Sequence, residues 1–317
     1  MTEQLADSYD VVVVGGGAAG LSGALMLGRS RRSVVVLDAG RPRNAPAEGV
    51  HGLLARDGMP PAELLARGRD EVRGYGGHVV PGEVGAVAKG GDGFTVTLVD
   101  GRTVAARRLL LATGLVDELP PVPGLRERWG RDVVHCPYCH GWEVRDRAVG
   151  VLAGSPMSVH QALLFRQLSA DVTYFAGTVP LAGEQAEQLT ARGVTIVPGT
   201  VAAVETADDR IAGVRLDDGT VVAREVLAVS TRMVARAELL AAFGLHAVAH
   251  PSGMGEHVPV VDPTGRTEVP GVWAAGNLTD LSAQVGAAAA AGALAGAAIN
   301  ADLIAEEARA AVAALRG

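Results

Sequence analysis

Two cysteines and two histidines stand together in the segment HCPYCHGWE (135–143), which holds both cysteines of the 317-residue chain. A Cys-x-x-Cys pair serves one of three chemistries: metal binding, a structural disulfide, or a dithiol that cycles between oxidised and reduced forms. Zinc is disfavoured, because neighbouring residues point in different directions and the two Cys-His pairs do not converge on one tetrahedral ion. A structural bridge is disfavoured because so short a loop removes little unfolded-state entropy. We interpret the pair as redox-active, with no metal.

The residues around the pair indicate how it could be activated. Pro137 suits the first turn of a helix, which would place Cys136 near the helix N-terminus, where the dipole stabilises a thiolate. His140 has the chemistry of a proton shuttle at neutral pH, the alternative being an ordinary polar helix residue. His135 is either a second base or a turn residue. Trp142 is either a pocket wall or a core residue, and the core is favoured.

A second motif lies near the N-terminus. Residues 9–14 form a continuous apolar run typical of a buried strand, 15–20 read GGGAAG, 21–32 have helical spacing, and 33–40 form another strand. The order strand, glycine turn, helix and strand is that of a dinucleotide-binding unit. Gly15 permits the tight turn, Gly17 lets the backbone approach a pyrophosphate, and Gly20 lets helix and strand pack closely. Asp38 is placed to accept a hydrogen bond from a ribose hydroxyl.

The same unit recurs later in the chain. Residues 149–160 align without gaps on residues 11–22, and 171–177 align on the second strand with one deletion. In this copy the three glycine positions hold Ala153, Ser155 and Ser158, and Phe175 stands in place of the acid. A β-carbon obstructs the approach of a pyrophosphate, and Pro156 removes an N–H from the turn. The fold repeats, and we expect the second nucleotide site to be degenerate.

Composition excludes several classes of function. The net charge of −7 with no basic stripe argues against nucleic-acid binding. The polar N-terminus lacks the pattern of a signal peptide, so we expect a cytoplasmic protein. The small, apolar residues 286–300 are expected within a buried helix spanning about 281–306 rather than in a membrane. Residues 217–219 (Asp-Asp-Gly) predict a hairpin turn.

Four motifs together resemble low-molecular-weight thioredoxin reductases over essentially the whole chain. They are the glycine turn, Ala112-Thr113-Gly114 at a strand end, the Cys-x-x-Cys pair and GVWAAGN (271–277). The resemblance implies an α/β fold with two Rossmann-like, three-layer (ββα) domains. A discontinuous FAD domain (1–116 and 246–317) would bracket an NADPH-domain-like unit (117–245) that carries the cysteines, and the protein would be a homodimer.

Within that family, the CPYCHG form resembles the dithiol oxidases of gliotoxin- and holomycin-type pathways; thioredoxin reductases carry aspartate in place of His140. The resemblance implies a FAD-dependent oxidase that closes a disulfide in a small dithiol and passes electrons to O2, giving H2O2. By this resemblance Cys139 faces the flavin and Cys136 is attacked by substrate. The alternatives are an NAD(P)H- or ferredoxin-dependent reductase of thioredoxin or a small disulfide, and a flavin redox sensor without turnover.

The predicted site residues form two groups. The catalytic group is Cys136, Cys139, His140 and His135. Arg43 and Asn44 follow the second strand and either contact adenosine phosphates or lie in a solvated loop. Asn277 stands where the family usually has an aspartate that bonds the ribityl chain. The predicted FAD-binding group is Gly15, Gly17, Ala18, Ala19, Gly20, Asp38, Ala39, Arg43, Asn44, Ala112, Thr113, Gly114, Gly276, Asn277, Gln284 and Val285.

Overall fold

The computed structural model describes residues 5–91, 93–155 and 157–316, which fold into two compact units. Unit 1 contains residues 5–45, 60–116 and 233–316 as far as they are described. Unit 2 contains residues 46–59 and 117–232. Each unit has its own sheet and its own hydrophobic clusters, as expected of separate folding domains.

The main sheet of unit 1 is mostly parallel. Its strands are, in spatial order, β3 (His78–Pro81), β2 (Val34–Asp38), β1 (Ser8–Val14), β6 (Thr103–Leu111), β5 (Gly93–Leu98) and β4 (Val84–Gly90), with β19 (Val272–Ala274) also paired to β6. Strand β1 is buried on both faces, which explains its uninterrupted valine run. Val11 and Val13 pack on the helical side, whereas Val12 and Val14 pack on the opposite side.

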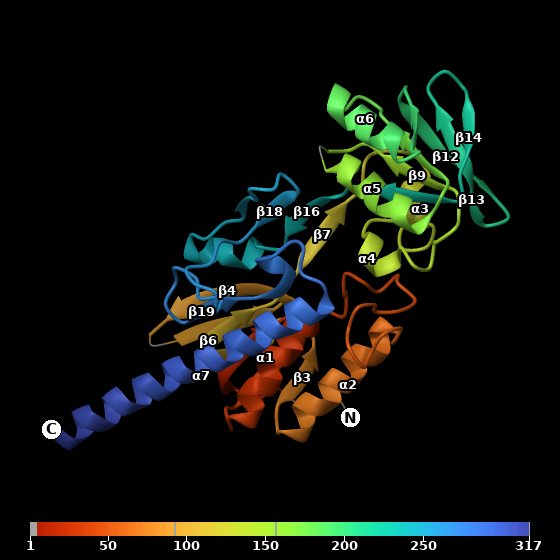
Figure 1. The fold of residues 1–317 in the computed structure, drawn as a ribbon. Helices are drawn as coiled ribbons and strands as arrows, with labels where there is room; N and C mark the ends of the chain where they lie inside the picture. Colours follow the sequence, from red (N-terminus) through yellow and green to blue (C-terminus); the bar gives the residue numbers. More distant parts are fainter. Residues whose placement is uncertain (1–4, 92, 156, 317) are drawn as a thin grey trace. The chain divides into compact units, whose positions relative to one another are not determined.

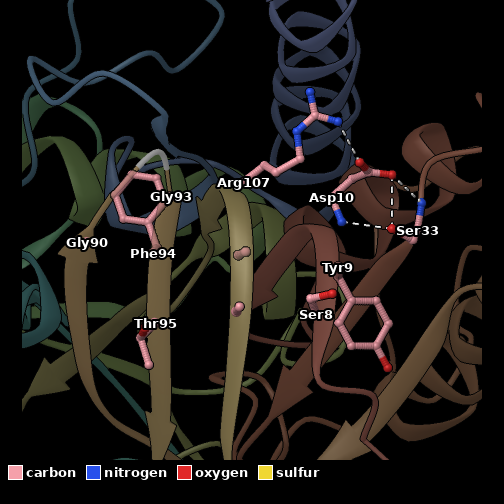
Figure 2. Close-up of a pocket in the computed structure, with 11 residues that line it drawn as sticks. Ser8, Tyr9, Asp10, Ser33, Gly90, Gly93, Phe94, Thr95 and Arg107 are labelled. Carbon is pink, nitrogen blue, oxygen red and sulfur yellow. Dashed lines mark hydrogen bonds and ion pairs between the residues drawn. The ribbon is translucent and has the colours of Figure 1, made fainter. Parts of the chain in front are cut away.

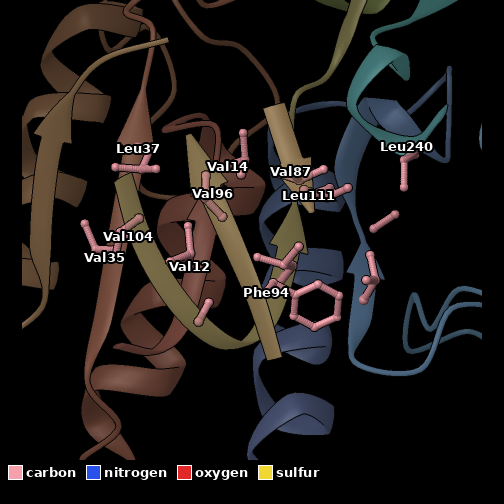
Figure 3. Close-up of a cluster of buried hydrophobic side chains, with 14 of the residues drawn as sticks. Val12, Val14, Val35, Leu37, Val87, Phe94, Val96, Val104, Leu111 and Leu240 are labelled. Carbon is pink, nitrogen blue, oxygen red and sulfur yellow. The ribbon is translucent and has the colours of Figure 1, made fainter. Parts of the chain in front are cut away.

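Three layers therefore make up unit 1. The helices α1 (Ala18–Arg29), α2 (Pro61–Gly74) and α7 (Val285–Arg316) provide one outer layer, and α1 and α7 run together beneath the sheet (Figure 1). On the other face, Val87, Phe94 and Val96 of the β4–β5 hairpin fold back over Val12 and Leu111 (Figure 3). This arrangement confirms the predicted three-layer, Rossmann-like architecture.

Helices α1 and α7 approach each other through glycines. A β-carbon at Gly292 would overlap the carbonyl oxygen of Ala19, and one at Gly296 would lie 2.6 Å from the carbonyl oxygen of Gly23. The buried residues of α7 form one stripe along its first half, consisting of Ala288, Gly292, Ala295, Gly296, Ile299 and Leu303. The apolar segment identified in the sequence thus packs within unit 1.

The helix α7 is longer than expected and continues to Arg316 rather than ending near residue 306. Ion pairs beyond the apolar stripe hold it to the sheet: Arg108 binds Asp302 at 2.7 Å, and Arg107 binds Glu306 at 2.7 Å. By length and composition, α7 is the one helix among the described residues that could cross a membrane. Its small-residue stripe is nevertheless buried against α1.

Unit 2 repeats this three-layer plan. Its parallel sheet has the spatial order β11 (Thr195–Val197), β10 (Val172–Phe175), β9 (Val149–Leu152), β15 (Val226–Val229) and β8 (Val133–Val134). The helices of this unit are α3 (Leu125–Arg128), α4 (Pro137–His140), α5 (Ser158–Leu168) and α6 (Gly183–Ala191). An antiparallel sheet of β12 (Val201–Ala207), β13 (Arg210–Leu216) and β14 (Val221–Ala223) packs on the other face. The expected hairpin turn at 217–219 joins β13 to β14.

The remaining elements are short. They are β7 (Leu115–Glu118), β16 (Arg232–Ala235), β17 (Val248–Ala249), β18 (Gly255–His257) and the 3₁₀ helices η1 (Glu238–Phe243) and η2 (Gly276–Leu278). One boundary between the units lies after residue 116, inside β7. Residues 233–245, expected in the middle domain, belong to unit 1, because Leu240 is buried in its core with Phe94. Residues 46–59 belong to unit 2 instead of the first domain.

The α1–α7 contact gives a prediction about stability. Glycine to alanine in a helix interior ordinarily stabilises the helix by about 1 kcal/mol. Gly292→Ala should instead destabilise unit 1 by about 1–3 kcal/mol, because the added methyl group overlaps the Ala19 backbone. Thermal unfolding followed by circular dichroism measures the effect. Gly183→Ala is the matched control, since a β-carbon there meets nothing within 4 Å; equal melting temperatures for the two variants would contradict the prediction.

Candidate functional site

The glycine turn in unit 1 has the shape that a bound phosphate requires. Gly15 has φ +107°, and a β-carbon on it would overlap the carbonyl oxygen of Ala112. A β-carbon on Gly20 would overlap the Gly15 carbonyl, so helix and strand meet through bare backbone. Gly17 is the N-cap of α1, and a β-carbon on it would meet no atom within 4 Å. The N-terminal N–H groups of α1 are therefore accessible to an anion.

Asp38 lies beside this turn at the end of β2, and a β-carbon on Gly16 would lie about 2.5 Å from its carboxylate. Its Oδ1 accepts a hydrogen bond from the Gly40 backbone at 3.0 Å, and its Oδ2 lies 3.2 Å from Nη2 of Arg69. Arg69 is a feature that the sequence did not reveal. It comes from α2, which rests on α1 where a β-carbon at Gly68 would lie 3.1 Å from Leu21.

Several other predicted cofactor residues come together in unit 1. Ala112 lies against Gly15, and a β-carbon on Gly276 would lie 2.8 Å from the Ala19 side chain. Nη1 of Arg43 lies 3.5 Å from Oδ1 of Asn277, which joins the loop after β2 to the late motif. The other predicted residues lie at the ends of these elements. Ala18 begins α1 and Val285 begins α7, Gln284 directly precedes α7, and Ala39 and Asn44 follow β2.

Asn277 has a local role that an aspartate could not perform. Its Nδ2 donates to the carbonyl oxygens of Asp280 and Ala283, both at 2.9 Å, and so fixes the loop that leads into α7. Thr113 likewise donates its hydroxyl to the carbonyl of Arg236 at 2.7 Å, while Gly114 adopts φ +72°. The open turn, the carboxylate at the end of β2 and these fixed loops fit a dinucleotide such as FAD.

The corresponding turn in unit 2 is filled by a side chain of the protein itself. Ser158 is fully buried, and its hydroxyl accepts hydrogen bonds from the backbone N–H groups of Gly154 at 3.1 Å and Ser155 at 3.2 Å. These are the donors that a phosphate would use. Phe175 is buried at the end of β10, where unit 1 has its acid. Pro156, also expected to weaken this site, lies outside the described residues.

The Cys-x-x-Cys pair lies at the start of α4. Cys136 and Cys139 are joined as a disulfide, with their Cα atoms 5.2 Å apart, and both residues are partly exposed. Cys136 is the N-cap and Pro137 occupies the first turn, as the sequence predicts. The helix is a single turn, however, so the dipole available to Cys136 is smaller than that of a long helix.

The two flanking histidines are in different situations. Both ring nitrogens of His140 are buried and have no hydrogen-bond partner among the described residues. Burial lowers the pKa of His140; the carboxylate of Glu143 opposes this shift, and His51 and His135 add to it. The Nδ1 of His135 instead lies 3.0 Å from the carbonyl oxygen of Val229. The backbone carbonyl of His135 accepts a hydrogen bond from the Gln161 side chain at 2.7 Å. His135 is fixed to the sheet, whereas His140 has unused proton-binding capacity.

Two more ionisable residues near the disulfide were not identified from sequence. The Nε2 of His51 lies 3.4 Å from Oε1 of Glu143, and His51 also acts electrostatically on His140. His51 is far from the cysteines in the chain and has no motif around it, so only folding reveals it. Trp142, expected in the core, is 65% exposed, and the guanidinium of Arg145 stacks 4.2 Å from its ring centroid.

A separate cavity of about 430 Å³ lies at the opposite end of β1 from the glycine turn (Figure 2). The two charged residues of its lining are paired: Arg107 binds Asp10 at 2.9 Å, and Asp10 accepts from the backbone and hydroxyl of Ser33 at 3.0 and 2.9 Å. We therefore regard this cavity as part of the network that holds the sheet to α7.

Comparison with known proteins identifies relatives over nearly the whole chain. Residues 9–295 match the family model described as pyridine nucleotide-disulphide oxidoreductase. "Thioredoxin reductase tcpT" of Claviceps purpurea is 35% identical over 286 residues, covering 84% of this chain and 86% of that protein. "Thioredoxin reductase sirT" of Leptosphaeria maculans is 32% identical over 310 residues, covering 92% and 93% respectively.

Solved structures give the same result. The crystal structure of HlmI is 46% identical, with a TM-score of 0.91, and the match covers 99% of this chain and 98% of that one. An oxidoreductase from Agrobacterium tumefaciens is 36% identical, with a TM-score of 0.87 and coverage of 94% and 99%.

The unit 1 site gives a prediction about cofactor affinity. Asp38→Ala should weaken FAD binding by about 10- to 150-fold, because a charge-assisted hydrogen bond to ribose is worth about 1.5–3 kcal/mol. The recovery of free flavin fluorescence on dilution measures the dissociation constant. Asp100→Ala is the control, since Asp100 pairs with Arg102 on the surface of the same unit. An unchanged FAD affinity in Asp38→Ala would remove Asp38 from the site.

Proposed function

This chain belongs to the pyridine nucleotide-disulphide oxidoreductase family, and within that family we propose that it is a dithiol oxidase. It would close a disulfide in a small substrate and pass the electrons to O2. Its family and relatives identify the chain as a FAD-dependent thiol/disulfide oxidoreductase of thioredoxin reductase-like fold, which acts on a dithiol, a disulfide or a thioredoxin-like partner. The homodimer and the cytoplasmic location stay predictions.

The observation that carries the proposal is the filled turn in unit 2. A nicotinamide-dependent reductase must bind NAD(P)H, and the anion-binding N–H groups of this turn are occupied by the Ser158 hydroxyl. With Phe175 buried in place of an acid, the described residues of unit 2 offer no carboxylate at the end of β10 to hold a ribose. Electrons would then enter from the dithiol and leave to an acceptor other than a nicotinamide, which supports O2 as the electron acceptor.

The chain's own residues would catalyse the thiol exchange. His140 takes the proton of a substrate thiol, and the resulting thiolate attacks Sγ of Cys136, breaking the Cys136–Cys139 bond and releasing Cys139 as a thiolate. The second substrate thiol then attacks the substrate sulfur of the mixed disulfide, and its proton passes to the Cys136 thiolate that leaves. His140 keeps the first proton, and Cys139 stays a thiolate. The substrate has lost two electrons and two protons, and the enzyme disulfide has gained the two electrons.

The unit 1 turn and Asp38 would hold FAD, which would supply the two-electron chemistry that links the cysteine pair to O2. One dithiol and one O2 would then give one disulfide and one H2O2. The competing function is that of a thioredoxin reductase, which the names of the Claviceps purpurea and Leptosphaeria maculans relatives favour. The two functions use the same cysteines in opposite directions, and the electron source distinguishes them.

The direct test is to mix the purified protein anaerobically with NADPH and, separately, with dithiothreitol. We expect dithiothreitol to bleach the flavin absorbance and NADPH to leave it unchanged, because Ser158 and Phe175 occupy the nucleotide site. Admission of air should restore the absorbance and release H2O2. The Cys139→Ser protein is the control and should keep FAD without being reduced by dithiothreitol. Rapid bleaching by micromolar NADPH would assign the protein to the reductases.

His140 should control the rate. His140→Asn should slow dithiothreitol-dependent oxygen uptake by about 10²–10⁴-fold while keeping FAD and the disulfide, because it removes the proton acceptor. Burial lowers the pKa of His140, so wild-type activity should persist below neutral pH and fall only as the pH drops through this lowered value and the imidazole becomes protonated. His160→Asn, on α5, serves as the control. A full rate in His140→Asn would exclude the proposed role.

A further inference from the structure

A loop in unit 2 is built to present His51. The two ends of the loop formed by residues 50–59 are joined by backbone hydrogen bonds. The N–H of Val50 donates to the Met59 carbonyl and the N–H of Gly58 donates to the Val50 carbonyl, both at 2.8 Å. Inside the loop, Oδ1 of Asp57 accepts from the backbone N–H of Gly52 at 2.8 Å. The loop is thus closed at its base and fixed across its middle.

His51 lies between two carboxylates. Its Nδ1 is 3.5 Å from Oδ2 of Asp57, which belongs to the same loop. Its Nε2 is 3.4 Å from Oε1 of Glu143, which follows α4 and the disulfide directly. The His51 side chain is only 23% exposed, so the protein encloses most of it between these two carboxylates. Glu143 therefore joins the loop to the segment that carries Cys136, Cys139 and His140.

The same carboxylate acts on His140. The ionisable groups that act electrostatically on His140, whose two ring nitrogens are buried, are Glu143, His51 and His135. Of these, Glu143 alone favours the protonated imidazole, since burial and the two histidines oppose it. A base that takes a proton from a thiol must carry a positive charge afterwards, and a nearby carboxylate stabilises that charge.

We propose that Glu143 is a positioning residue that holds His51 against the disulfide segment and serves as the counter-charge for the proton that His140 receives from the substrate. This inference rests on the proposed thiol exchange and adds to it a carboxylate–histidine pair that the sequence motif does not contain. Glu143 touches neither substrate nor cofactor in this proposal, and its effect passes through His51 and His140.

The sign of the pH effect follows from the charges. His140 works as a base only when neutral, so the rate falls as the pH drops through its pKa. Removing the Glu143 charge disfavours the imidazolium, so Glu143→Gln should move the acidic limb of the pH–rate profile to lower pH. We expect a shift of about half a unit to one unit, because Glu143 is 39% exposed and water screens it. Above the limb the weaker base should turn over about two- to tenfold more slowly.

The experiment uses the FAD-loaded full chain with dithiothreitol, and oxygen uptake is recorded from pH 5 to 9. Glu143→Gln should show the shifted limb with a lower kcat and little change in KM, and Glu143→Asp, which keeps the charge, should restore the limb. Glu187→Gln removes the same charge from the exposed face of α6 in the same unit and should match the wild type. In a His51→Gln background, Glu143→Gln should have a smaller effect, since part of its action passes through His51.

Each outcome decides the matter. A Glu143→Gln profile that coincides with that of Glu187→Gln, or a limb shifted to higher pH, would overturn the proposal. A wild-type protein that consumes no oxygen would instead refute the oxidase function. In that case the pH dependence of disulfide reduction by dithiothreitol, recorded anaerobically, still tests Glu143, because exchange at Cys136 is common to both directions. Melting temperatures and flavin absorbance verify that each variant is folded and loaded.

Discussion

The glycine turn of unit 1 depends on contacts between bare backbones. Gly20 brings α1 onto the carbonyl of Gly15, and Gly292 and Gly296 bring α7 onto the backbone of α1. Any side chain at these points would push the helices apart and displace the N-terminus of α1, where an anion would bind. The sheet, the helical layer and the cofactor site are consequently fixed by one set of close approaches, and the ion pairs farther along α7 extend the same contact.

Unit 2 shows how little must change for such a turn to lose its ligand. Its parallel sheet and covering layers repeat those of unit 1, yet the buried Ser158 hydroxyl satisfies two N–H groups that would otherwise bind phosphate. A satisfied buried donor gains nothing from a ligand that must first displace its partner. The unit keeps the fold as a support for the disulfide segment, and this division of roles agrees with entry of electrons through a dithiol.

The disulfide segment combines an exposed reaction centre with a buried base. Cys136 and Cys139 are partly exposed, as an exchanging disulfide must be, whereas the ring nitrogens of His140 are withdrawn from solvent. The single-turn helix α4 gives little dipole, so charges on neighbouring segments matter more. Glu143 and His51 both act electrostatically on His140, and His51 connects the disulfide segment to a loop that is distant in sequence.

The sequence by itself determined the features that depend on short spacings. Strand β1, the turn at Gly15, Gly17 and Gly20, Asp38 at the strand end, the repeated unit and the helix start at Cys136 all follow from local periodicity and backbone requirements. Only the tertiary structure decided which distant side chains meet. Arg69 reaches Asp38, His51 reaches Glu143, Trp142 stays exposed, and residues 46–59 join unit 2. Each depends on how whole elements pack, and packing between segments far apart in the chain leaves no pattern in a single sequence.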